Sequence, residues 1–190
     1  MSGPHLLPLF VRLERRRVLL VGGGRMATER ATQLVAAGAD VTVVAPDIRP
    51  ALAQLPVRIR QRPFEPDDVE NVFFVIAAAP STVNAAVAAA AEARHVLVNA
   101  VDDLPNATAY FAGVVRRGDV TFAVSTEGRA PALTALLRQA LEVVLPDDFE
   151  HWTGLAERLR REWRRDNVAM DARRPLLLRA LNRLYCEATE

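Results

Sequence analysis

A glycine-rich turn between an apolar run and a helical pattern constrains the fold of this 190-residue chain more than any other feature. Residues 18–21 are consecutive apolar residues, typical of a buried strand, and glycines follow at once. Gly22, Gly24 and Ala27 fit the G-x-G-x-x-A pattern of dinucleotide sites. In that pattern the first glycine permits a tight turn, the second lets a pyrophosphate approach the backbone, and the small third residue lets the helix pack on the strand. The motif predicts a nucleotide site at the helix N-terminus, and a glycine turn without a ligand is the alternative.

Apolar runs alternate with helical patterns through the first half of the chain, which predicts a parallel sheet with helices between its strands. The expected strands are residues 18–21, 41–44, 57–60, 72–77 and 96–98. The expected helices are residues 25–37, 48–55 and 82–93. The fold class is therefore α/β, with a Rossmann-like parallel sheet that binds ligands at the carboxyl ends of its strands.

Residues just beyond the strands are the candidates for cofactor contacts. Asp47 is the first carboxylate after the second strand, where an acidic side chain binds the adenosine ribose of NAD, and a helix cap before Ile48 is its alternative role. No arginine directly follows that strand to hold a 2′-phosphate, which favours NAD over NADP. Small residues around Ala78 leave room for a ligand at the same edge, and the alternative is that alanines simply fit a crowded turn between strand and helix. The expected cofactor-binding residues are Gly22, Gly23, Gly24, Arg25, Met26, Ala27, Asp47, Ala78, Asn99 and Val101.

Beyond residue 110 the pattern changes from parallel strands to a hairpin and helices. Residues 110–115 and 120–124 read as two strands, and residues 116–119 as the turn between them. A polar loop then leads to a helix at residues 132–144. The last forty or so residues read as helices separated by residues 166–174. At the other end of the chain, the apolar residues 6–13 are expected to pack against the edge of the sheet.

Charge, apolar run length and histidine spacing predict which partners, locations and metal sites the chain lacks. The formal net charge is +1, so we expect no nucleic-acid partner and no membrane partner. No apolar run reaches membrane-spanning length and the start does not resemble a signal peptide, so we expect a cytoplasmic protein. The three histidines are far apart in the sequence and show no metal-ligand spacing, so we expect no metal site.

Three stretches carry a resemblance to a known family: Val-Gly-Gly-Gly-Arg-Met-Ala at residues 21–27, Asn-Ala-Val-Asp-Asp at 99–103, and the run from Arg-Arg-Gly-Asp to Ala-Pro-Ala-Leu at 116–133. Together they resemble the precorrin-2 dehydrogenase family, the dehydrogenase and ferrochelatase module of sirohaem synthesis. The resemblance implies a homodimer in which an NAD-binding Rossmann domain is followed by a dimerisation region and a small helical domain. The implied boundaries are 1–112, 113–145 and 146–190.

The same resemblance implies a reaction. Family members oxidise precorrin-2 to sirohydrochlorin with NAD, and some insert Fe²⁺ to give sirohaem, so Fe²⁺ or Co²⁺ is a further expected substrate. Asp102 matches the family's catalytic acidic residue, and a carboxylate beside the nicotinamide can take the proton that leaves when a hydride is removed. Capping of a turn is the alternative role for Asp102. Asp103 ranks behind it because it would point to the other side of a continued strand.

A second group of residues is expected to contact the substrate. Ser125 and Thr126 match the family's hydroxyl pair, with capping of the following helix as the alternative. Arg129 and Arg116 are candidates for binding substrate carboxylates, since guanidinium groups bind them in a bidentate manner. The family loop usually runs Ser-Thr-Gly-Gly-Lys-Ser-Pro, whereas this chain has Ser-Thr-Glu-Gly-Arg-Ala-Pro at residues 125–131.

Two classes of function therefore compete. The first is an NAD-dependent precorrin-2 dehydrogenase serving sirohaem or cobalamin synthesis, with or without metal insertion. The alternative is a non-catalytic domain that senses NAD and controls a partner, which would need neither Asp102 nor a cleft for an anionic substrate. The combination of residues 99–102 with residues 125–131 favours the enzyme.

Overall fold

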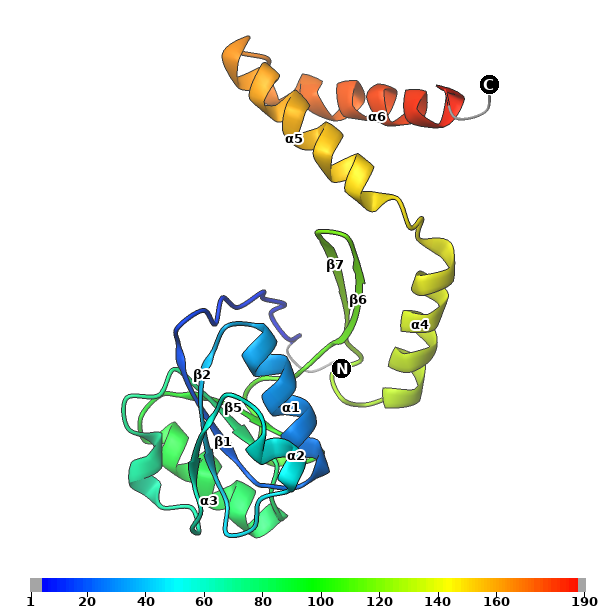
Figure 1. The fold of residues 1–190 in the computed structure, drawn as a ribbon. Helices are drawn as coiled ribbons and strands as arrows, with labels where there is room; N and C mark the ends of the chain where they lie inside the picture. The colour runs from blue at the N-terminus through cyan, green and yellow to red at the C-terminus, as the bar shows by residue number, and fades with distance from the viewer. Residues whose placement is uncertain (1–4, 188–190) are drawn as a thin grey trace. The chain divides into compact units, whose positions relative to one another are not determined.

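The computed structural model describes residues 5–187, with side chains up to residue 183. It divides into two compact units, Met1–Phe111 and Ala112–Glu190. Each unit has its own secondary structure (Figure 1).

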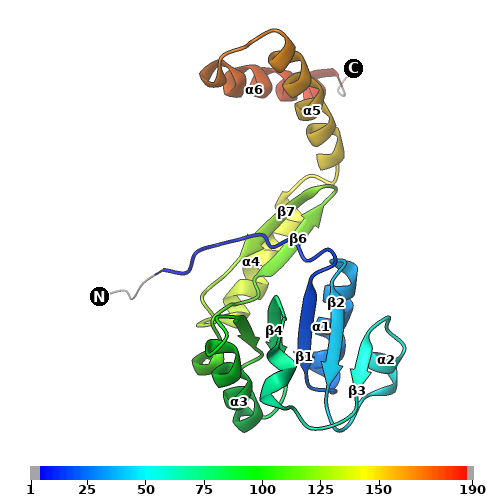
Figure 2. The ribbon, with the colours of Figure 1, turned by 90° about the vertical axis from the view of Figure 1, so that its left-hand side faces the viewer.

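The first unit is built on a five-stranded parallel sheet in the order β3-β2-β1-β4-β5. Figure 2 shows several of these strands side by side. The order reverses direction between β1 and β4, which is the position where doubly wound sheets bind nucleotides. The α/β, Rossmann-like fold expected from the sequence is confirmed. The strands are β1 (Arg17–Val21), β2 (Asp40–Val44), β3 (Arg58–Arg60), β4 (Phe74–Ala77) and β5 (Leu97–Ala100).

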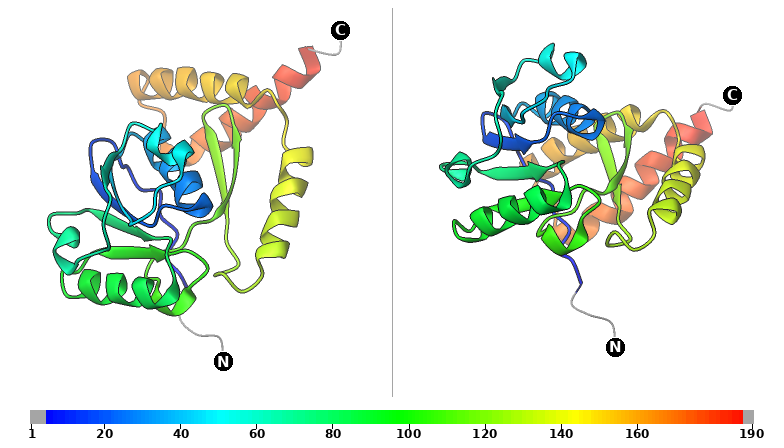
Figure 3. Two further views of the ribbon diagram at one scale, coloured as in Figure 1. Left: turned by 60° about the horizontal axis from the view of Figure 1, so that its bottom comes forward. Right: turned by 90° about the horizontal axis from the view of Figure 1, so that it is seen from below.

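Helices cover both faces of this sheet, and each face has its own apolar core. The helix α1 (Arg25–Ala36) packs with alternate strand residues such as Leu20 and Ile76. The helix α3 (Ser81–Glu92) packs on the opposite face with residues such as Leu19 and Val75 (Figure 3). Central strands buried on both faces explain why β1 and β4 read as continuous apolar runs in the sequence.

Short elements connect these layers, and two prolines set the bounds of the helix α2. The helix α2 (Pro50–Ala53) is shorter than the expected 48–55. Arg49 precedes Pro50 and is extended (φ −64°, ψ 142°), because a residue before proline is disfavoured in the helical region. Pro56 restricts Leu55 in the same way. Two 3₁₀ helices complete the unit, η1 (Pro66–Val69) and η2 (Leu104–Asn106).

The second unit contains an antiparallel hairpin and three helices. Strand β6 (Gly113–Arg117) pairs with β7 (Val120–Val124), and α4 (Pro131–Val144) packs against the hairpin. The helices α5 (Phe149–Arg165) and α6 (Met170–Glu187) pack against each other.

Three further details differ from the sequence-based expectations. Arg116 lies within β6 rather than in the turn, because the two-residue turn at Gly118 and Asp119 uses a positive φ of 51° at Gly118 and lets the strands run further. The last helix begins at Met170 and contains Pro175, so one missing backbone donor does not end it.

The third difference lies at the start of the described chain, where residues 6–11 do not pack against the sheet. Leu7 and Phe10 are 78% and 76% exposed. Leu13 is the point at which the chain first packs on the α1-side core. Within the described residues, no helix is both long and apolar enough to cross a membrane.

Candidate functional site

The glycine turn after β1 is shaped by two close backbone approaches. Gly22 has φ +124°, and a Cβ built on it would lie 2.2 Å from the carbonyl oxygen of Ala78. A Cβ on Gly23 would lie 1.8 Å from the carbonyl oxygen of Asp47. Both distances are far below van der Waals contact, so only glycine fits at these positions. The turn therefore brings the ends of β1, β2 and β4 together at one edge of the sheet.

Gly24 differs from its neighbours because its surroundings are open. A Cβ there would meet no heavy atom of the described residues within 4 Å. Gly24 is the N-cap of α1, and no side chain caps the helix's first N–H groups, so these donors and the positive end of the helix dipole remain for a ligand beside this opening. Ala27 is fully buried in the α1-side core, which holds the helix close to the sheet. This arrangement fits a pyrophosphate.

The remaining residues of the motif lie around this opening. Arg25 is exposed and forms an ion pair with Glu29, at 3.1 Å between Nη1 and Oε1, one turn along α1. Met26 is half-buried. Asp47 does not cap α2, whose N-cap is Arg49, so the alternative role weighed for Asp47 is wrong. The Arg49 N–H instead donates to the carbonyl of Gly23 (3.0 Å), which fastens residues 45–49 to the glycine turn.

Strand β5, which pairs with β4, ends two residues later than the sequence predicted and includes Asn99. Asn99 is buried, and its Nδ2 donates to the carbonyl of Ala109 (2.9 Å). Its Oδ1 is buried without a hydrogen-bond partner among the described residues. The Val101 N–H donates to the carbonyl of Ala77 (2.8 Å), so the backbone pairing of β4 and β5 continues to the residue before Asp102.

Asp102 and Asp103 occupy different environments although they are adjacent. Asp103 accepts hydrogen bonds from Ser81 Oγ (3.0 Å), Asn84 Nδ2 (3.2 Å) and Asn106 Nδ2 (2.9 Å). The Asn106 amide, followed by the Asn84 and Ser81 donors, lowers the pKa of Asp103. Asp102 is exposed and, within the described part of the chain, makes no side-chain hydrogen bond. The N-cap residue of η2 is Asp103 and not Asp102, so the alternative role of Asp102 as the cap of this turn is wrong.

The reason for this asymmetry is the backbone. Asp102 has φ +55°, a left-handed conformation that aspartate tolerates better than most residues, and the chain turns there. Both carboxylates line a shallow depression of about 380 Å³ at the ends of β4 and β5. Its lining residues are Ala79, Ser81, Asn84, Val101, Asp102, Asp103, Leu104 and Pro105.

Two residues near this depression escaped the sequence analysis. Asn84 is 1% exposed in an alanine-rich helix, and its Oδ1 accepts the Ala79 N–H (3.2 Å) while its Nδ2 holds Asp103. The sequence signal that could have identified Asn84 is a single polar residue in an alanine-rich helix. Arg30 interacts electrostatically with Asp102, and its guanidinium carbon lies 4.3 Å from the centre of the Phe111 ring. Burial lowers the pKa of Arg30, while the charges of Glu29 and Asp102 oppose that shift.

The second unit carries the residues expected to contact the substrate. Ser125 Oγ accepts the Glu127 N–H (3.1 Å), and Thr126 Oγ1 accepts the Ala130 N–H (3.2 Å) at the start of α4. Thr126 therefore holds the loop just before α4, but the N-cap is Ala130 and no side chain caps this helix, so the capping alternative for Ser125 and Thr126 is wrong. Arg129 pairs with Glu127 at 2.5 Å.

Arg116 is exposed and lies opposite Thr121 in the hairpin. Across the described residues, no group of three or more His, Cys, Asp or Glu side chains is placed to hold a metal ion.

Comparison with known proteins agrees with this geometry. Residues 9–113 match the sequence model of a protein family described as "Putative NAD(P)-binding". The chain belongs to this NAD(P)-binding family. The matched range contains the sheet, the glycine turn and Asp102.

The relatives extend the similarity into the second unit. The chain is 40% identical to Siroheme synthase 1 of Yersinia enterocolitica over 88% of its own length, and 44% identical to the siroheme synthase of Tolumonas auensis over 83%. It spans only 37% and 34% of the lengths of these relatives. Among solved structures it is similar to SirC, a precorrin-2 dehydrogenase, with a TM-score of 0.71 and 25% identity over 92% of this chain and 88% of that one. The resemblance expected from the sequence is confirmed.

Proposed function

We propose that this chain oxidises precorrin-2 to sirohydrochlorin with NAD. The observation that carries the proposal is the pairing of a formed dinucleotide site with an exposed carboxylate, Asp102, at the same edge of one sheet. The similarity to SirC, which covers nearly the whole of both chains, supports the choice of substrate.

The chain's own residues divide the chemistry between binding and proton transfer. Bound NAD supplies the hydride acceptor. Gly22, Gly23 and Gly24 bring the backbone close to the pyrophosphate, and the first N–H groups of α1 bind it. Oxidation removes a hydride and a proton from the substrate, and Asp102 takes the proton. Asp103, held by three donors, fixes the loop so that the Asp102 side chain faces the depression.

In the second unit, we propose that the hydroxyl groups of Ser125 and Thr126 and the guanidinium groups of Arg116 and Arg129 contact the carboxylate-bearing substrate. The ion pair between Arg129 and Glu127 offsets the acidic charge that this loop carries in place of the family's glycine. Fe²⁺ or Co²⁺ insertion is the second activity that we propose to test, since Asp102 can also accept the pyrrole protons that leave as a metal ion enters.

Exposed apolar residues on α4 support a homodimer with the dimerisation region at residues 113–145. Leu133, Leu136, Leu137 and Val144 share one face at helical spacing, and Leu136 and Val144 are 63% and 77% exposed. We propose that a second copy covers this face, between an NAD-binding domain at 1–112 and a helical domain at 146–190. We place the protein in the cytoplasm, where its NAD-dependent reaction has a cofactor pool.

Anaerobic absorbance spectroscopy tests the proposed reaction. The wild-type chain with precorrin-2 and NAD should produce the sirohydrochlorin spectrum, and adding Fe²⁺ or Co²⁺ then tests metal insertion. Asp102→Asn should abolish the spectral change and leave NAD affinity, measured by calorimetry, unaltered, because asparagine tolerates the positive φ.

The matched control is Asp103→Asn, which removes the neighbouring carboxylate and should reduce rather than abolish the rate. If NAD binds and no spectral change occurs in the wild-type chain, the enzyme proposal fails and the NAD-sensing domain replaces it.

A further inference from the structure

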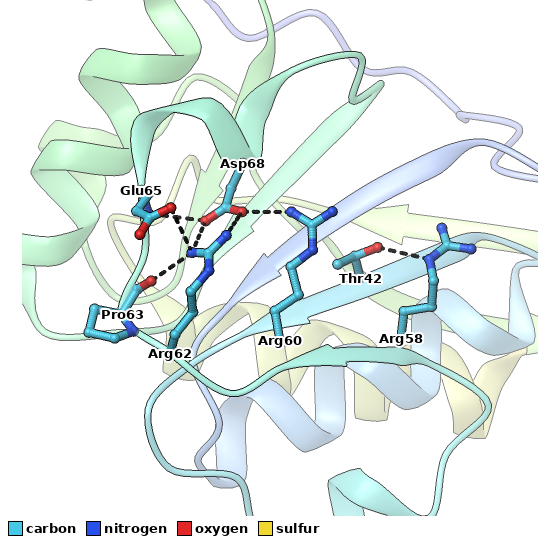
Figure 4. Close-up of polar contacts among 7 residues, drawn as sticks. All are labelled: Thr42, Arg58, Arg60, Arg62, Pro63, Glu65 and Asp68. Carbon is cyan, nitrogen blue, oxygen red and sulfur yellow. Dashed lines mark hydrogen bonds and ion pairs between the residues drawn. The ribbon is translucent and has the colours of Figure 1, made fainter.

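A buried carboxylate holds two arginines beyond the edge strand of the sheet. The Asp68 side chain is 1% exposed. Its Oδ1 accepts from Arg60 Nη1 (2.8 Å) and Arg62 Nη2 (2.6 Å), and its Oδ2 accepts from Arg62 Nη1 (2.8 Å). The Glu65 N–H donates to Oδ2 at 3.0 Å. Figure 4 shows both guanidinium groups directed at this one carboxylate.

These contacts keep the cluster charged. Burial opposes ionisation of Asp68, but the donors of Arg62, Glu65 and Arg60 outweigh it, and the pKa of Asp68 lies below its usual range. The Asp68 hydrogen bond also raises the pKa of Arg62. One buried negative charge is therefore shared by two positive charges.

The backbone that carries these two arginines lies beside the segment expected to bind the adenosine ribose. Arg60 is the register partner of Val44, the last residue of β2, and the Ala45 N–H donates to the Arg60 carbonyl (3.3 Å). Gln61 Nε2 donates to the carbonyl of Pro46 (3.2 Å), which precedes Asp47. Residues 60–62 and 45–47 thus form adjacent parts of one edge. In nucleotide-binding sheets, an arginine near the end of the second strand holds the 2′-phosphate of NADP.

We propose that Asp68 makes the cofactor site selective for NAD over NADP, by engaging the two guanidinium groups that would otherwise bind a 2′-phosphate. Asp68 is a positioning residue, because it acts through Arg60 and Arg62 and not on the cofactor. A 2′-phosphate would have to compete with a buried carboxylate that already uses three N–H groups of these arginines. The inference rests on the nucleotide site of the proposed function and adds its specificity.

Calorimetry with NAD and with NADP tests this inference without any turnover. Asp68→Asn keeps the shape of the side chain and removes its charge. NADP should then bind about tenfold more tightly, the effect of one charge-assisted contact, while NAD affinity changes by less than about twofold. Adding Arg60→Gln and Arg62→Gln to that variant should remove the gain.

The matched control is Asp67→Asn, which makes the same charge change one residue away. Asp67 is exposed and pairs with Arg94 at 3.3 Å, so neither affinity should change.

Gln61→Arg provides a second test that does not disturb the buried carboxylate. Gln61 is exposed, so the substitution is compatible with folding, and it adds a guanidinium group that Asp68 does not hold. NADP affinity should rise in this variant as well. Unchanged NADP affinity in Gln61→Arg, or an equal change of both affinities in folded Asp68→Asn, would overturn the inference. Absence of NAD binding to the wild-type chain would instead defeat the proposed function itself.

Discussion

Replacing Gly24 by alanine should separate cofactor binding from folding. The backbone at Gly24 is extended (φ −83°, ψ −166°), which any residue adopts, and the new Cβ would meet no heavy atom of the described residues within 4 Å. Alanine is a poorer N-cap than glycine, which costs about 0.5–1 kcal/mol. Replacing a glycine also lowers the conformational entropy of the unfolded chain, which stabilises the folded state by about 0.4–1 kcal/mol. The two terms nearly cancel, so the melting temperature should move by less than about 4 °C.

NAD affinity should fall in the same variant, because the methyl group occupies the space where the pyrophosphate approaches the backbone. We expect a loss of at least about tenfold in calorimetry, which is about 1.4 kcal/mol. Gly38→Ala is the control with the opposite expected result, a loss of stability without a loss of binding. Gly38 has φ +75° in the turn after α1, so alanine should lower the free energy of unfolding by about 1–2 kcal/mol and leave NAD affinity unchanged. If Gly24→Ala binds NAD as the wild type does, the pyrophosphate does not lie at this turn.

Three further outcomes follow from individual contacts. The pKa of Asp103 is lowered in the folded chain, so its stabilising effect is present above the unfolded pKa of about 3.9 and is lost as the pH falls through the folded pKa. The free energies of unfolding of the wild type and of Asp103→Asn, measured in urea, should therefore differ at about pH 7 and converge in acid. Leu52 is fully buried in the α1-side core, so Leu52→Ala should lower the free energy of unfolding by about 2–5 kcal/mol in the same assay. Thr126→Val removes the acceptor of the Ala130 N–H and should cost about 1 kcal/mol, measured by thermal unfolding.

The layered part of the fold was predictable because its signals are local. An apolar run, glycines and a helical repeat define β1, the turn and α1, and the same alternation places β4 and α3. The bounds that failed depend on single residues acting through the backbone. Pro50 shortens α2, and the positive φ of Gly118 lengthens the hairpin strands so that Arg116 falls inside one of them.

The glycine turn of the candidate site was predictable from the sequence, but the contacts that shape it were not. The motif identified Gly22 and Gly24, yet the reason that Gly23 must also be glycine is the carbonyl of Asp47, which comes from a different strand. The ranking of Asp102 above Asp103 assumed that the strand continues, whereas β5 ends at Ala100. What distinguishes the two carboxylates is the set of donors around Asp103, among them Asn84 from a helix some twenty residues earlier. Sequence order does not reveal such long-range pairs.

Two carboxylates of the first unit are held in the same physical arrangement. Asp68 and Asp103 have their oxygens occupied by neighbouring donors, and each fixes the loop or side chains around it. Asp47 and Asp102 are exposed and, for the residues described, make no side-chain hydrogen bonds. A carboxylate whose lone pairs are already used is a poor ligand group, while one without partners can bind a ribose or accept a proton. The structure therefore separates acidic residues whose oxygens are already hydrogen-bonded from the two that we propose to contact the ligands.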